Sequence, residues 1–391
     1  MTSVTKPLPR SRPGAPETLW TRIAGAVWLS SVVALAAYAH WHPQSHTVYD
    51  IYSAASRRWM AGEDVYVPTR EYYRYSPLFT VAMTPLAALP DEWGGVIWKL
   101  VNCGVFALGV RAWLGRLHLH ELSRAQSAAV FLLVLPMSAH SMYNSQANLM
   151  MMGSLLLGLA SACDERWNRA ALWLAWATLL KVYPLAMAAL VAALFPRRFA
   201  WRFLIALGLG LLLPFAAQAP AVVASQYHGW FAHMLDSTQI MRERVRGLDW
   251  LAMIYFRPLS QPAWLALEAA GGLAVLALSQ WNRRQSDNAR ASLATTFDAF
   301  ALWVVLLGPA TEACTYVVAA PTAALAVVRA FSRCHVPVAR LASVAAIVMM
   351  GPSVTDLFGK TIRNFSVEQG MQPLGALVLA GCLAGEVWRQ C

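Results

Sequence analysis

The residues best suited to chemistry in this sequence are ionisable groups at the ends of long apolar segments. Asp50 follows the first such segment, Lys181 interrupts a later one, and Glu312 stands in the short polar stretch 308–316. Ionisable groups at membrane depth are costly and normally mark a function or a partner. A carboxylate can take a proton from a hydroxyl, and a cation can stabilise negative charge that develops during a reaction. These groups therefore indicate a functional site in a membrane protein.

The composition predicts an all-α integral membrane protein around these groups. The 391-residue chain is 58% hydrophobic and only 13% charged, whereas soluble domains are about a quarter charged. Helices are the expected spanning elements, because lipid leaves no partners for an open strand edge. We predict about twelve transmembrane helices, at 20–40, 93–113, 125–142, 147–163, 169–182, 184–196, 202–218, 262–281, 294–310, 313–330, 338–355 and 371–388.

The loops between these segments predict the orientation of the chain. Residues 1–19 are Pro-rich and basic, and we expect a cytoplasmic tail there, followed by one multi-span domain at 20–391. Most Lys and Arg residues then fall in inner loops, as the positive-inside rule requires. We expect the protein in the plasma or inner membrane, with both termini in the cytoplasm. The loops 41–92 and 219–261 are then outside. The net charge of +11 is explained by this topology, so no nucleic-acid partner is expected.

Three segments differ from simple spans. The stretch 46–66 is amphipathic and suits an interfacial helix. The stretch 75–90 is apolar but short and contains three prolines, so we predict an interfacial or re-entrant helix on the outer face. Residues 169–196 are long for one span and short for two, with Pro184 in the middle. Because proline kinks or ends a helix, we predict two short helices that meet at "LKVYP" beside an outer cavity.

Polar residues at the outer ends of these helices describe a cavity that opens to one side. The candidates are Asp50, Tyr75, Asn144, Gln146, Asn148, Lys181, Tyr183, His228, Arg242, Arg244, Arg246 and Glu312.

Each candidate also has a structural interpretation. Asp50 is placed to cap an interfacial helix, and Lys181 to extend to the membrane surface. The amides at 144–148 can join helices, the arginines at 242–246 can contact anionic headgroups, and Glu312 can pair with a structural cation. Histidines are more often packing or surface residues than ligands. These interpretations stay open beside the functional ones.

Several short motifs occur in order along the chain. Asp50 precedes an amphipathic run through Ala55, Gly62 and Tyr66, and "YSPL" leads into an apolar helix with "PLAALP". Later come "NSQANLMMMGSLLLGLA", "LAWATLLKVYPL" and the polar "GPATEACTY". Their order and spacing over 45–330 resemble glycosyltransferase family 87, a family of the GT-C superfamily that includes polyprenol-phosphate-mannose-dependent α-1,2-mannosyltransferases.

The resemblance implies a GT-C fold and a membrane glycosyltransferase. A hexose such as mannose would pass from a polyprenyl-phosphate sugar donor to an acceptor hydroxyl on the extracytoplasmic side, with inversion in a single displacement. Asp50 occupies the family's position for the general base, and Lys181 carries over as a ligand of the donor phosphate. Further candidates for the phosphate, by chemistry alone, are His228, Arg242, Arg244 and Arg246.

The remaining candidates are expected to bind substrate: Tyr75, Asn144, Gln146, Asn148, Tyr183 and Glu312. We expect no metal and no cofactor, because Lys and Arg side chains can neutralise the leaving phosphate and the six cysteines show no CxxC pairing. The expected partners are the donor, a lipid or glycan acceptor and membrane lipids.

Two other functional classes are consistent with parts of the pattern. A transporter or flippase of a lipid-linked or small polar substrate is the alternative, because broken helices and midplane charges also occur there. It predicts a polar path open to both faces and internal repeats, and we find no repeat. A non-catalytic scaffold or lipid-binding subunit would tolerate the loss of Asp50.

Overall fold

The computed structural model describes most of the chain as helix, and its described parts contain no strand. These parts are residues 15–44, 47–67, 73–240, 246–285, 288–308, 311–334 and 336–390. The α-helices are α1 (Ala15–Trp41), α2 (Tyr49–Ala61), α3 (Pro77–Ala87), α4 (Asp91–Leu117), α5 (Arg124–Tyr143), α6 (Asn148–Cys163), α7 (Trp167–Leu180), α8 (Pro184–Leu194), α9 (Trp201–Leu212), α10 (Pro220–Ile240), α11 (Leu248–Tyr255), α12 (Gln261–Gln285), α13 (Ala289–Leu307), α14 (Ala320–Arg333), α15 (Pro337–Met350), α16 (Lys360–Glu368) and α17 (Met371–Gln390).

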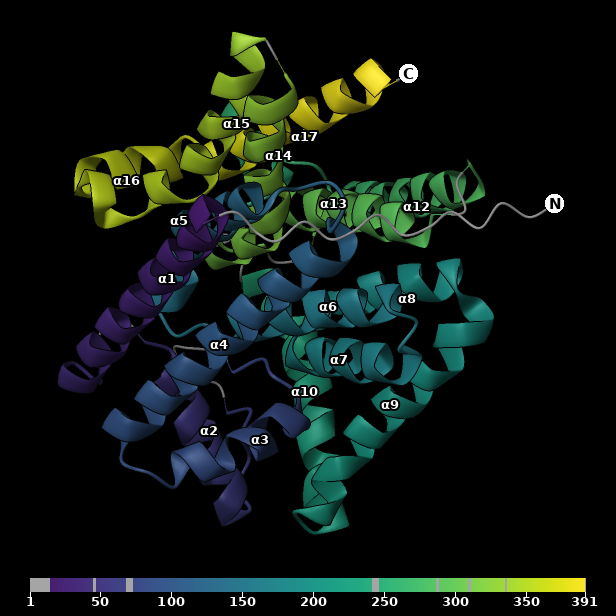
Figure 1. Ribbon diagram of the computed structural model, residues 1–391. Helices are drawn as coiled ribbons and strands as arrows, with labels where there is room; N and C mark the ends of the chain where they lie inside the picture. Colours follow the sequence, from purple (N-terminus) through teal and green to yellow (C-terminus); the bar gives the residue numbers. More distant parts are fainter. Residues whose placement is uncertain are drawn as a thin grey trace.

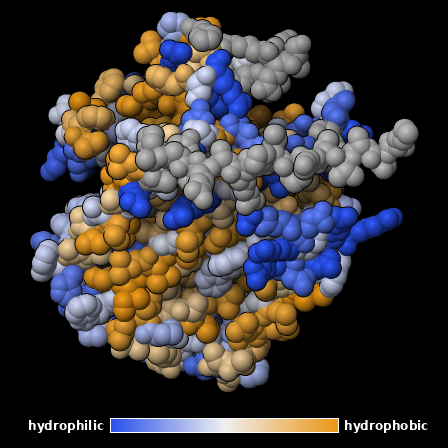
Figure 2. All heavy atoms as spheres, viewed as in Figure 1, coloured by the Kyte–Doolittle hydropathy of each residue, from blue (hydrophilic) through white to orange (hydrophobic). Residues whose placement is uncertain are grey.

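The predicted all-α membrane architecture is confirmed. Each predicted span largely coincides with helical structure, and eight helices of the described chain are long and apolar enough to cross a membrane. Shorter apolar helices include α6, α8 and most of α17. The chain is therefore a multi-pass membrane protein, while twelve crossings stays a prediction. Figure 2 shows hydrophobic side chains over much of the visible face, with hydrophilic ones gathered where α8 leads into α9.

Small residues bring α4 and α6 into backbone contact. A Cβ atom on Gly109 would lie 2.5 Å from the Gly153 carbonyl oxygen, and one on Gly153 would lie 2.5 Å from the Val105 carbonyl oxygen. Close approach of this kind stabilises helix pairs in lipid, where packing replaces the hydrophobic effect. The contact holds the first turns of α6 firmly against α4.

The predicted break at "LKVYP" is confirmed. Helix α7 ends at Leu180, Lys181 has an extended backbone (φ −146°, ψ 142°), and α8 begins at Pro184. The apolar stretch after Tyr75 forms the 11-residue α3, with Pro77 as its first residue. In Figure 1, α2 and α3 lie together at one end of the molecule, whereas α15 and α16 lie at the opposite end.

The expectation that Asp50 caps α2 is wrong. The N-cap residue is Val48, whose side chain makes no capping hydrogen bond. Asp50 is the second residue of the helix and lies in its first turn, where the positive end of the helix dipole favours a carboxylate.

Candidate active site

A cavity of about 470 Å³ lies along one face of α2. Asp50, Ser53, Ala54 and Arg57 contribute to it at spacings of three and four residues, which places them on the same side of the helix. The opposite side of α2 buries Tyr52, Ser56 and Trp59 in the core. The remaining lining residues are Gln44, Ile51, Ala55, Arg58, Val65, Val67, Tyr73 and Asp91. Asp50 therefore belongs to the lining of an open cavity.

Helix α2 is tied to its neighbours at both ends. Near its end, Arg57 donates to Asp91 at the start of α4 over 2.5 Å. Before its first residue, the Val48 amide donates to the Asn144 carbonyl over 3.0 Å. These bonds fix the helix that carries Asp50 against α4 and against the loop between α5 and α6.

A second group of polar residues surrounds Glu312. This residue precedes the 3₁₀ helix η4 (Ala313–Ala319), and its carboxylate accepts the Thr315 amide in a capping box. The Arg74 guanidinium lies 3.8 Å from one carboxylate oxygen. Arg246, in the segment before α11, also interacts electrostatically with Glu312. Three segments distant in sequence thus converge on one carboxylate.

The Cys314 thiol connects this carboxylate to the break between α7 and α8. Its sulfur lies 3.6 Å from Glu312 Oε2, and both the Lys181 ammonium and the Asn148 amide interact with the same thiol. Tyr183 interacts electrostatically with Cys314 and Glu312, as does Tyr75. We call this group the Glu312 cluster: Arg74, Tyr75, Asn148, Lys181, Tyr183, Arg246, Glu312 and Cys314.

Two members of the cluster present buried polar atoms whose capacity for hydrogen bonds is not filled by the described residues. Asn148 is fully buried, and within the described chain neither of its amide atoms has a hydrogen-bond partner of ordinary geometry. The same holds for the buried Tyr183 hydroxyl. Buried polar groups are nearly always hydrogen-bonded, so the exceptions call for water or a ligand. An amide and a phenol in this state are suited to the hydroxyls of a sugar.

Three side chains of α4 hold the loop that leads to Asn148. Trp98 donates to the Ser145 carbonyl over 2.8 Å, and Lys99 donates to the last two carbonyls of α5, each over 2.9 Å. Asn102 donates to the Gln146 carbonyl and accepts an amide of α6, over 2.8 and 2.6 Å. This α4 clamp fixes a loop in which Ser145 has a left-handed backbone, with φ +56°.

One short segment connects the α2 cavity to the Glu312 cluster. Tyr73 lines the cavity, Arg74 pairs with Glu312, and the ring of Tyr75 lies 5.5 Å from that of Tyr73. The Tyr75 hydroxyl in turn lies 2.7 Å from the Tyr52 hydroxyl on the buried side of α2. The two regions therefore share an aromatic wall, with Asp50 on the cavity side.

Residues 73–309, more than half of the chain, match the family model of glycosyltransferase family 87. The chain belongs to glycosyltransferase family 87. No curated protein matches it. The matched region contains the aromatic wall at 73–75, the α4 clamp and the break between α7 and α8. Asp50 and Glu312 lie outside it, one on each side.

This family 87 protein does not bring every predicted residue to the Glu312 cluster. The Asn144 amide donates to the His140 carbonyl within its own helix, over 3.0 Å. Gln146 is partly exposed and takes part in the α4 clamp through its backbone. His228 lies on the exposed side of α10. Arg242 and Arg244 lie outside the described residues.

The buried side of α10 contributes other residues than His228. Gln226 accepts the Val65 amide and donates to the Glu63 carbonyl, over 3.1 and 3.0 Å. Trp230 donates to the Arg74 carbonyl over 3.2 Å. These residues recur at helical spacing along α10 and fasten the segment that follows α2.

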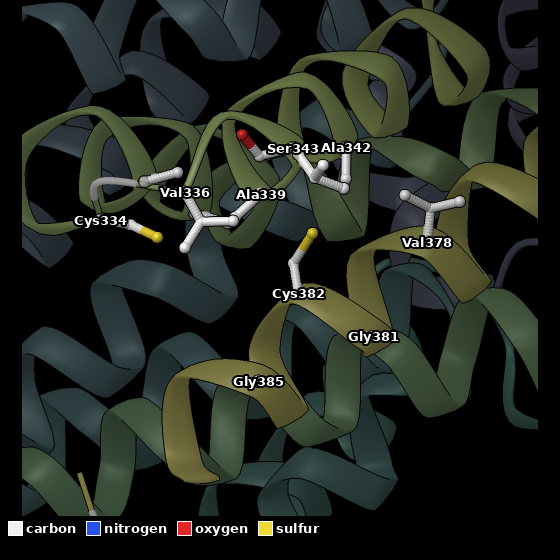
Figure 3. A pocket seen from close by; sticks show the side chains of 12 residues that line it. Cys334, Val336, Ala339, Ala342, Ser343, Val378, Gly381, Cys382 and Gly385 are labelled. Atoms are coloured by element: carbon white, nitrogen blue, oxygen red, sulfur yellow. The ribbon is translucent and has the colours of Figure 1, made fainter. Parts of the chain in front are cut away.

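The family 87 chain has a further cavity of about 330 Å³ between α14, α15 and α17. Its walls are Ala, Val and Gly residues with Ser343, Cys334 and Cys382, and Figure 3 shows the Cys382 side chain extending from α17 toward α15. Such a lining offers no carboxylate, imidazole or cation, so the α2 cavity and the Glu312 cluster are the better candidates for chemistry.

Proposed function

We propose that this glycosyltransferase moves a hexose, with mannose as the first candidate, from a polyprenyl-phosphate sugar to an acceptor hydroxyl on the extracytoplasmic side of the membrane. The observation that carries the proposal is the Glu312 cluster, where cations and buried amide and phenol groups with unfilled hydrogen-bonding capacity meet near the cavity that Asp50 lines.

The cations of the cluster are suited to the phosphate of the donor. Lys181 acts on Cys314 next to Glu312, and Arg246 acts on Glu312 itself from a different segment. Burial lowers the pKa of the Arg246 guanidinium, while the carboxylates of Asp249 and Glu312 raise it, and an arginine stays charged in either case. Positive charge that is already in place stabilises the phosphate charge that grows as the sugar bond breaks.

The sugar would lie between these cations and the aromatic wall. Asn148 and Tyr183 would bond its hydroxyls, because both present buried polar atoms that make no hydrogen bond of ordinary geometry within the described chain. Tyr75 would supply an aromatic face, the kind of surface on which a sugar ring packs. The polyprenyl chain would remain in the apolar surroundings of the membrane.

The acceptor would enter the α2 cavity, where Asp50 would act as general base. The acceptor oxygen attacks the anomeric carbon, its proton passes to the Asp50 carboxylate, and the bond to the phosphate oxygen breaks. The electron pair of that bond leaves with polyprenyl phosphate. One displacement inverts the anomeric carbon, and a phosphate leaving group needs no general acid.

The test compares Asp50→Asn with wild type in detergent, using polyprenyl-phosphate hexoses and candidate acceptors. Loss of a general base typically reduces the rate by about 10²–10⁴-fold, whereas binding of the donor should persist. Glu63→Gln is the matched control, because Glu63 is an exposed carboxylate just after α2. Transfer by Asp50→Asn at near the wild-type rate would rule out this role.

A further inference from the structure

The ion pair between Arg74 and Glu312 is long for its type. The two charged groups are 3.8 Å apart, whereas a charge-assisted hydrogen bond of this kind spans about 2.7–2.9 Å. Each side chain is about a quarter exposed, at 26% and 28%. The Glu312 carboxylate is meanwhile engaged by its own capping box. Arg74 is thus attracted to Glu312 without being held by a close bond to it.

The backbone beneath Arg74 is held from three sides. Its carbonyl accepts the Trp230 indole, and the next carbonyl, that of Tyr75, accepts the Tyr66 hydroxyl over 2.8 Å. Ser76 donates to the Leu179 carbonyl over 2.5 Å, two residues before Lys181. The Arg74 side chain therefore extends from a backbone segment that is held in place and is hydrogen-bonded to the end of α7.

The described residues around Arg74 include two further cations. Lys181 and Arg246 belong to the same cluster, where Arg246 lies beside the carboxylates of Glu312 and Asp249. A guanidinium can meet two phosphate oxygens at once, which a lysine ammonium cannot do in a fixed plane.

We infer that Arg74 is a ligand of the donor phosphate, and that Glu312 is the counter-ion that holds its guanidinium in place until the phosphate arrives. This inference rests on the proposed function. It places the phosphate at the aromatic wall, because Arg74 directly follows Tyr73, which lines the cavity of Asp50. On binding, the guanidinium exchanges a 3.8 Å contact for closer bonds to phosphate oxygens.

The inference is tested by titrating purified protein with polyprenyl phosphate alone, and by measuring thermal unfolding of the same samples. Arg74→Gln should weaken binding on the order of tenfold or more, the effect of one charged hydrogen bond. Arg74→Lys keeps the charge but loses the planar fork of the guanidinium. Its affinity for polyprenyl phosphate should lie between those of Arg74→Gln and wild type. Arg363→Gln is the control, because it removes an arginine from the exposed pair with Asp356 and should leave binding unchanged.

Exchanging the charges of Arg74 and Glu312 distinguishes a role of Arg74 in binding from a purely structural ion pair. The double variant Arg74→Glu with Glu312→Arg restores an attractive pair but not the capping box of Glu312, so it should unfold at a higher temperature than Arg74→Glu alone. Its binding of polyprenyl phosphate should stay weak, because the cation now projects from η4. Recovery of both properties would overturn the inference.

Two further outcomes distinguish this inference from the proposed function. If wild type binds polyprenyl phosphate and Arg74→Gln binds it within twofold, the role of Arg74 is wrong and the proposed donor stands. If wild type transfers sugar from another donor and binds no polyprenyl phosphate, the proposed donor is wrong, and this inference fails with it.

Discussion

Replacement of Lys99 by methionine tests how the site is held in shape. Lys99 is only 1% exposed on a membrane-spanning helix, and its ammonium donates to the carbonyls of Met142 and Tyr143, each over 2.9 Å. These carbonyls end α5, where the helix dipole favours a cation. Lys99→Met keeps the length of the side chain and removes both bonds.

The expected loss follows from these two bonds. Each hydrogen bond from a charged donor contributes about 1.5–3 kcal/mol, and two contribute about 3–6 kcal/mol. Methionine avoids the cost of burying an ammonium, which offsets part of that sum. We therefore expect the free energy of unfolding to fall by about 2–3 kcal/mol. Transfer should also slow in protein that remains folded, because the loop leading to Asn148 loses one part of its clamp.

The assay is unfolding by SDS in mixed micelles, combined with transfer at a temperature at which both proteins stay folded. Leu100→Met is the matched control, because Leu100 is the next residue of α4 and is 43% exposed. If Lys99→Met changes the free energy of unfolding no more than this control does, the two hydrogen bonds do not hold the end of α5 and the reasoning is refuted.

Three shorter predictions concern charge, packing and metal. Burial raises the pKa of Glu121, but bonds from His118 and Arg329 outweigh it and hold that pKa well below its usual range. The stabilisation is present above the unfolded pKa of about 4.3 and is lost as pH falls toward the folded value, so the stability difference between Glu121→Gln and wild type should shrink below about pH 4. Gly153→Ala should lower stability by about 1–3 kcal/mol, because its Cβ would meet an α4 carbonyl at 2.5 Å, whereas Gly381→Ala enters open space and should not. Chelation by EDTA should leave transfer unchanged, and loss of transfer that Mg²⁺ or Mn²⁺ restores would refute metal independence.

Local features of the sequence predict most of the helices. An apolar run is a property of consecutive residues, so it predicts a spanning helix whatever tertiary contacts that helix makes. Pro77 and Pro184 mark helix starts because proline acts on its own turn. The cap of α2 is different, because it depends on a contact with a segment that is distant in sequence. The bond from Val48 to Asn144 fixes this cap, and nothing near Asp50 in sequence indicates it.

The sequence reveals less of the site, because its pairs join distant segments. Lys99 has no partner nearby in sequence, and the carbonyls that satisfy it come from α5. Arg74 and Glu312 lie near opposite ends of the chain segment 74–312, and only the fold pairs them. For α10 a local signal does exist. Gln226, Trp230 and His233 recur at helical spacing and are buried, whereas His228 falls off that face.

The proposed inversion gives a reason for the arrangement at 73–75. A single displacement requires the attacking hydroxyl and the leaving phosphate on opposite sides of the anomeric carbon. Asp50 lines the cavity that Tyr73 also lines, and Tyr75, two residues further on, belongs to the Glu312 cluster. A sugar placed at Tyr75 would then lie between its base and its phosphate ligands. The arrangement does not suit a double displacement, because that mechanism needs a nucleophilic carboxylate and a second acid–base residue close together.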